Sequence, residues 1–168
     1  MTAQAVDETN RKMLSYLSQE RDLRGHVADK GWSHAAAHAA DALNRLAQCP
    51  ELGKESLLDT LRVIRETVVN ACDVFIYGED ERLVRPVLSA IQRQVLDKAD
   101  IAQWISSFAS FELTPTLPEW LRRRTNVKHF MRSLYFRSLY QKVIEWFEPA
   151  LGQTLQEISE SKIPSSYF

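Results

Sequence analysis

The chain is poor in the features that define several large protein classes. It has only two cysteines, Cys49 and Cys72, both inside or at the ends of apolar helical patterns, where a free cysteine behaves as a small hydrophobic side chain. This favours a reducing, cytoplasmic setting over a disulfide framework. Residues 1–11 lack the apolar run of a signal peptide, and no stretch of about 18 consecutive apolar residues occurs. We therefore expect a soluble, cytoplasmic protein without a membrane span.

An excess of charge of one sign is also missing. Lysine and arginine number 21 and aspartate and glutamate 22, so no overall field attracts the chain to nucleic acid or to a membrane. The sequence has no Gly-rich phosphate loop, no Gly-x-Ser-x-Gly turn and no Cys-x-x-Cys pair. Because no complete catalytic set is present, we favour a protein that is not an enzyme.

Apolar residues recur with the 3.6-residue period of α-helices, and a length of 168 residues fits one domain. No convincing strand is found, and Asp73 to Tyr77 is assigned to helix because it continues a helical phase. We predict an all-α domain of five to seven helices over residues 1–162, either a HEAT-like superhelix or an irregular bundle, followed by a flexible tail at 163–168. The predicted helices are 6–17, 33–49 with Ser33 as N-cap, 56–77 opened by a capping box at Ser56, 83–95, one capped by Asp100, 119–147 with a break near Thr125-Asn126, and a short last helix after Pro149.

Residues 24–41 hold the densest concentration of polar side chains that are able to do chemistry. If a helix starts at Ser33, then His34, His38 and Asp41 share one face, and the apolar residues of the helix gather on the opposite face. In the preceding loop, Arg24, Asp29 and Lys30 flank Trp32. This region is the candidate functional site.

Three interpretations of this region are open. The first and favoured one is structural: the histidines pack on neighbouring helices and hydrogen-bond to Asp41, Asp29 or backbone carbonyls, the charged loop residues form a buried ion-pair network, and Trp32 and Tyr77 are edges of the core. In the second, Arg24, Asp29, Lys30, Trp32, His34, His38 and Asp41 bind a ligand. In the third, a divalent metal is held by His34, His38 and Asp41, with Glu79, Asp80 or His26 as a further ligand. The spacing lacks the glutamate of a His-Glu-x-x-His zinc protease.

A basic stretch begins at Glu119, and seven lysines or arginines precede residue 143 against that one acid. Arg124, Lys128 and Arg132 form a stripe at i, i+4 and i+8, beside Tyr135 and Tyr140. Such a stripe is able to contact phosphates. We favour a solvated face that balances the acidic helices, and we do not expect a nucleic-acid partner.

Several runs of this sequence resemble the bacterial family of domain of unknown function 2785. The similarity is strongest from Arg24 to Leu43 and fades after Arg82; it rests on the runs Glu20–Gly25, Lys30–His34, Ala37-His38, Ala40-Asp41 and Glu79–Leu83. The resemblance implies an all-helical, HEAT-like fold and brings no established activity. It also implies a long helical stretch before the Arg-Gly motif, which this chain nearly lacks. Either the chain is a short member or a fragment, or another chain covers its flank.

Large aromatic residues are numerous for a short bundle, and an apolar face of more than a few hundred Å² is normally a contact surface. A two-fold dimer covers such a face with its own copy. We therefore predict a homodimer that uses the first helix and the aromatic C-terminal helices; the alternative is that one monomeric core holds all of these rings. The aromatic residues in question are Trp104, Phe108, Phe111, Trp120, Trp146 and Phe147.

The function predicted from these observations is that of a non-catalytic helical binding or scaffold protein. Its binding surface is the polar region of residues 24–45, which a rigid helix presents to a partner or a small ligand. The alternative is a metal-dependent hydrolase with His34, His38 and Asp41 as metal ligands and a carboxylate near Glu79 as the general base.

Overall fold

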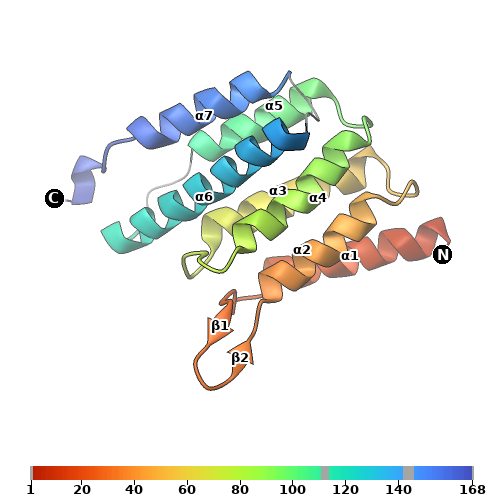
Figure 1. Cartoon of the computed structure of the whole chain (residues 1–168), viewed down its shortest axis with the longest axis horizontal. Coiled ribbons are helices and arrows are strands. Elements are labelled where there is room, and N and C mark those ends of the chain that lie inside the picture. Colours follow the sequence, from red (N-terminus) through yellow and green to blue (C-terminus); the bar gives the residue numbers. More distant parts are fainter. Residues whose placement is uncertain (1, 111–113, 142–145, 168) are drawn as a thin grey trace.

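The computed structural model describes residues 2–110, 114–141 and 146–167, and these residues are mainly α-helical (Figure 1). The predicted all-α class is confirmed. Two three-residue 3-10 turns, Ser107–Ala109 and Ser165–Tyr167, complete the regular structure together with a two-stranded hairpin. The described helices are α1 (Ala3–Gln19), α2 (Ala35–Ala47), α3 (Lys54–Asn70), α4 (Glu79–Gln92), α5 (Lys98–Ser106), α6 (Leu117–Gln141) and α7 (Glu148–Glu160).

The helices pack in successive layers along the chain (Figure 1). At one side α1 packs against α2 and α3, and α2 lies along α4. In the middle, α3 and α4 contact each other and α6, and on the far side α7 covers α5 and α6. None of the described helices is long and apolar enough to cross a membrane.

The packing of α2 against α4 uses the alanines of α2. Ala36, Ala39 and Ala40 are completely or almost completely buried, as is Leu43 one turn later. Because alanine is the smallest helix-forming side chain, α2 packs tightly on α4 and leaves its polar face outside. That polar face, as the sequence predicts, carries His34, His38 and Asp41, from the N-cap to the middle of the helix.

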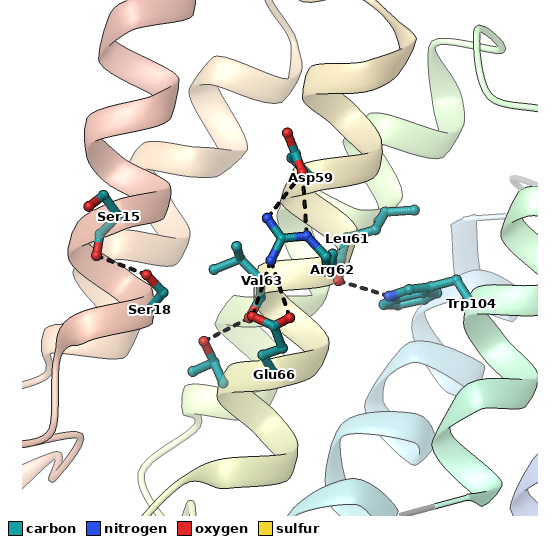
Figure 2. Close-up of polar contacts among 9 residues, drawn as sticks. Ser15, Ser18, Asp59, Leu61, Arg62, Val63, Glu66 and Trp104 are labelled. Carbon is teal, nitrogen blue, oxygen red and sulfur yellow. Dashed lines mark hydrogen bonds and ion pairs between the residues drawn. The ribbon is translucent and has the colours of Figure 1, made fainter.

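The large aromatic residues of α5 and α6 form the centre of the far layers. Trp104 and Phe108 meet edge to face at 5.0 Å between ring centroids, and Phe108 stacks on Phe130 at 5.4 Å. Figure 2 shows the Trp104 indole N–H donating to the carbonyl of Leu61 in α3, at 2.8 Å, next to Arg62. On the surface of α3 Arg62 itself bridges Asp59 and Glu66 (Figure 2).

Burial of these rings corrects the basis of the predicted dimer contacts. Trp104, Phe108, Trp120 and Phe147 are at most 8% exposed, and Trp146 packs against the same core. Phe111 lies outside the described residues, as does Lys142 of the basic stretch. The described aromatic residues that we expected to form an uncovered face therefore belong to the core of a single chain.

Two helix boundaries differ from the prediction, and the side chain of Asn126 accounts for the first. Asn126 is fully buried in α6, where its amide oxygen accepts from the N–H of Phe75 and its amide nitrogen donates to the carbonyl of Asp73, both at 2.9 Å. These bonds hold residues 71–78 as a loop, so the predicted helix over Asp73–Tyr77 is wrong. Asn126 makes these bonds from within α6, which is continuous through the position where we predicted a break.

The prediction that the chain has no strand is also wrong. β1 (His26–Val27) pairs antiparallel with β2 (Gly31–Trp32), and Asp29 in the turn and Gly31 have φ angles of 63° and 85°. Two-residue strands are too short to produce an alternating apolar pattern, so the sequence offers little signal for them.

Helix starts were predicted within a few residues. The N-cap of α2 is His34 rather than Ser33, that of α3 is Gly53 rather than Ser56, and that of α5 is Asp97 rather than Asp100. At the other end of the chain, Tyr167 lies in the segment 163–168 that we predict to be a flexible tail. Its hydroxyl donates to the Thr114 carbonyl at 2.8 Å.

Candidate functional site

The hairpin projects from the N-terminal end of α2 (Figure 1). Tyr77, in the loop before α4, contacts rings of both strands of the hairpin. Four rings meet there: His26 and Trp32 from the two strands, His34 from the N-cap of α2, and Tyr77 from the loop before α4. We call these four residues the arm cluster. They come from two segments that lie more than forty residues apart in the sequence.

Trp32 is the centre of the arm cluster. Its ring centroid lies 4.5 Å from that of His34, 5.1 Å from that of His26 and 5.4 Å from that of Tyr77. The contacts to His26 and Tyr77 are edge to face, the arrangement that the quadrupoles of aromatic rings favour. Even so, Trp32 is 63% exposed and Tyr77 is 44% exposed, so both rings also present surface to solvent. They are not the edges of the core that we predicted.

A buried carboxylate lies beneath the arm cluster. Glu79, the first residue of α4, is 1% exposed; its Oε2 accepts from the backbone N–H of Tyr77 at 2.8 Å, and its Oε1 lies 3.6 Å from Nε2 of His34. That nitrogen is buried and has no hydrogen-bond partner among the described residues. Glu79 thus fixes Tyr77 directly and faces the imidazole of His34.

Gly25 is the residue that lets the hairpin approach this carboxylate. A Cβ at position 25 would lie 2.4 Å from Oε1 of Glu79 and 2.4 Å from Cδ2 of Tyr77, distances that no side chain permits. The Gly25 carbonyl accepts from the N–H of Ser33 at 2.8 Å, and the N–H of His34 bonds to the carbonyl of Arg24 at 3.1 Å. These bonds close the base of the hairpin and hold His34 in the left-handed conformation, at φ 45°.

The other predicted site residues lie around the cluster without joining it. The Asp41 carboxylate binds the guanidinium of Arg82 and lies 3.4 Å from that of Arg85, both on α4. His38 is exposed, and its ring lies 6.4 Å from that of His34. Three exposed charged residues, Arg24, Asp29 and Lys30, surround the base and tip of the hairpin.

An ion pair fixes the residue that leads into the hairpin. Nε and Nη2 of Arg24 each donate to a different oxygen of Asp22, both at 2.7 Å. The Arg24 guanidinium holds the pKa of Asp22 at about 2, well below the usual value for an aspartate. Both side chains of this pair are about half exposed, so it is not the buried ion-pair network that we expected of the charged loop residues.

The structure does not bring the predicted metal ligands together. Among residues 2–110, 114–141 and 146–167, no group of three or more His, Cys, Asp or Glu residues is placed to hold a metal ion. Two arginines occupy the carboxylate of Asp41, which the hypothesis required. Of the predicted set, only His34 and Glu79 face each other.

Sequence reasoning found Trp32, His34 and Glu79 but missed the other parts of the site. His26 was named only as a spare metal ligand, and Gly25 was given no role. Gly25 is visible in the sequence as part of the Arg-Gly motif. The need for glycine at this position depends on contact with Glu79, which is distant in the sequence. The two exposed rings of the cluster, Trp32 and Tyr77, thus lie beside the buried carboxylate of Glu79.

Comparison with known proteins supports the resemblance seen in the sequence. A family model described as protein of unknown function (DUF2785) matches residues 1–136 of the 168. The match includes the entire arm cluster and extends well past Arg82, where the similarity that we recognised fades. No curated protein and no solved structure matches the chain. Because the family model covers most of the chain, this protein belongs to the DUF2785 family.

Proposed function

We propose that this protein is a non-catalytic binding protein whose contact surface is the arm cluster. The observation that carries the proposal is the exposure of Trp32, at 63% of its surface. Burying a large apolar side chain contributes about 1.5–3 kcal/mol, so an exposed indole forgoes most of that stabilisation. An exposed tryptophan that a partner buries recovers it on binding, which is why tryptophan and tyrosine are frequent anchors of interfaces.

Rigidity supports the same function. Trp32 touches three other rings, and Glu79 holds the backbone of Tyr77 from below. A side chain already fixed in one position loses little conformational entropy when a partner binds. The arm cluster is therefore prepared for contact before the partner arrives.

The charged residues around the cluster indicate the class of partner. Arg24 and Lys30 are positive and Asp29 is negative, and Arg24 is already paired with Asp22. A phosphate backbone requires a surplus of free positive charge, which this mixed rim does not offer. An apolar centre with a polar rim of both signs is typical of a protein–protein interface. The favoured partner is a protein surface with an apolar pocket for the indole.

The hydrolase alternative receives no support from a particular observation. Its three metal ligands are not assembled, and Asp41 is held by Arg82 and Arg85. We therefore propose binding alone.

The test replaces Trp32 with a photo-crosslinking phenylalanine analogue in cells of the source organism. The matched control places the same analogue at Tyr16, an exposed aromatic residue (45%) on α1. We expect light-dependent crosslinking to one discrete protein from position 32 and not from position 16. No discrete product from position 32, or the same products from both positions, would contradict the proposal.

A further inference from the structure

A second apolar surface lies on the last turns of α6, apart from the arm cluster. Phe136 is 52% exposed, Leu139 37% and Tyr140 82%. They follow one another at i, i+3 and i+4, so they share one side of the helix. We call this surface the α6 face. Unlike the aromatic residues of the core, these side chains have no layer of the described chain over them.

A groove of about 390 Å³ runs beside the α6 face. It is lined by Phe136 and Tyr140, by Arg132, Ser133 and Arg137 of the same helix, and by Glu81 from the first turn of α4. The Ser133 hydroxyl donates to Asp80 at 2.6 Å and Arg137 pairs with Glu81 at 3.1 Å, so α4 and α6 are joined along one wall.

The groove is lined by a carboxylate, Glu81, and by a guanidinium, Arg132, whose charges are complementary. The side chain of Glu81 is 61% exposed despite its pair with Arg137, so its carboxylate is accessible to a further cation. Arg132 is exposed and has no acidic partner among the described residues. One helical turn earlier, burial and the neighbouring guanidiniums of Arg124 and Arg132 lower the pKa of Lys128, as expected where positive charges gather without acids between them.

We propose that the α6 face is the contact surface of a homodimer, in which Phe136 and Tyr140 pack against the same residues of a second copy and Arg132 pairs with the partner's Glu81. A two-fold axis brings one patch against itself, so the patch must hold both members of each charge pair. The groove holds both members of such a pair, because exposed Glu81 and Arg132 line it together with Phe136 and Tyr140.

The two kinds of contact have different roles in this dimer. Removal of the phenyl and phenol rings from water drives association. The Arg132–Glu81 pairs at the edge select the register and add little affinity, because rim charges remain close to water. The predicted homodimer is thus retained, but its contacts move from the buried tryptophans to exposed residues of α6.

Sedimentation equilibrium from low micromolar to submillimolar concentration tests the dimer. We expect the mass to rise above the 19.3 kDa of one chain and the variant Phe136→Asp to stay monomeric. The matched control is Tyr16→Asp, which places the same charge at an exposed aromatic position on α1 and is expected to dimerise normally. Thermal melting establishes that each variant is folded. A wild-type mass that stays at 19.3 kDa, or a Phe136→Asp variant that dimerises like wild type, would overturn the proposal.

Charge reversal tests the register. Arg132→Glu and Glu81→Arg are each expected to weaken self-association by about tenfold or more, because each places like charges opposite each other twice. An equal mixture of the two variants restores both pairs and is expected to form a heterodimer with near wild-type affinity. A mixture that associates no better than either variant alone would overturn the proposed pairing. Trp32→Ala should leave dimerisation unchanged, which separates this inference from the function proposed for the arm cluster.

Discussion

Two groups of aromatic rings in this protein have nearly the same geometry and opposite surroundings. Trp104 meets Phe108 at 5.0 Å and 89°, and Trp32 meets Tyr77 at 5.4 Å and 87°. The first tryptophan is 8% exposed and the second is 63% exposed. Edge-to-face contact between rings therefore does not by itself tell whether a cluster belongs to the core; burial does.

The indole N–H groups of Trp104 and Trp32 differ in the same way as the burial of their rings. The indole N–H of Trp104 donates to the carbonyl of Leu61, as a buried N–H group must find an acceptor. The indole of Trp32 makes no hydrogen bond with the described residues and is open to water. A partner can thus satisfy the Trp32 N–H without breaking any bond of the fold.

The largest effect is expected when each tryptophan is replaced by alanine. Trp104→Ala should lower the free energy of unfolding by about 3–5 kcal/mol, because it opens a cavity among Phe108 and Phe130. Trp32→Ala should lower it by less than about 1 kcal/mol, since most of that ring is already in water. Urea unfolding followed by circular dichroism measures both. Comparable losses from the two variants would show that Trp32 belongs to the core.

The second prediction concerns Gly25, which lets the hairpin approach Glu79 and Tyr77 because it has no side chain. Gly25→Ala forces a methyl group against the Glu79 carboxylate and the Tyr77 ring, and should cost about 1–3 kcal/mol of unfolding free energy. The matched control is Gly152→Ala in α7, where a new Cβ meets nothing within 4 Å. That variant should be stabilised by about 0.5–1 kcal/mol, because alanine is the better helix former. If Gly25→Ala is as stable as wild type, the close approach of hairpin and Glu79 does not exist in solution.

The core was easier to predict from sequence than the arm cluster. Helices such as α3 and α4 show the apolar period over many residues, and each was located within a few residues of its start. The error at 73–77 arises from Asn126, whose bonds to Asp73 and Phe75 span about fifty residues of sequence. No local pattern encodes a tertiary hydrogen bond, so local reasoning assigned the loop to helix.

The candidate site was predicted in part for the same reason. His34, His38 and Asp41 do follow one another along one side of α2, from its N-cap to its middle, as helical spacing requires. The sequence does not indicate that Asp41 would be bound by Arg82, because that arginine comes from another helix. Nor does it indicate that Tyr77 and Gly25 would meet, since a side chain of α4 brings them together.

A smaller effect should separate the two histidines. His34→Ala removes the imidazole that faces the buried Glu79 and contacts Trp32, and should lower the free energy of unfolding by about 1 kcal/mol. His38→Ala should change it by less than about 0.5 kcal/mol, because His38 is exposed. Chemical unfolding in parallel with wild type gives both values. A loss of 1 kcal/mol or more from His38→Ala would restore the structural role that we favoured for that residue.

The smallest effect concerns the ion pair between Asp22 and Arg24 at the entry to the hairpin. The pKa of Asp22 lies at about 2, below the roughly 3.9 of an aspartate in an unfolded chain. A lowered pKa means that the pair stabilises the fold above pH 4, and that this contribution disappears as pH falls through 2. Because both side chains are about half exposed, the effect on stability should be close to the limit of detection, but the titration itself is measurable. Carboxyl-carbon NMR should show a midpoint near pH 2 for Asp22, shifted toward 3.9 in Arg24→Gln and unchanged in the control Arg21→Gln. A wild-type midpoint near pH 4 would mean that the pair is open in solution and that the hairpin is held only by its backbone bonds and by the contacts of the arm cluster.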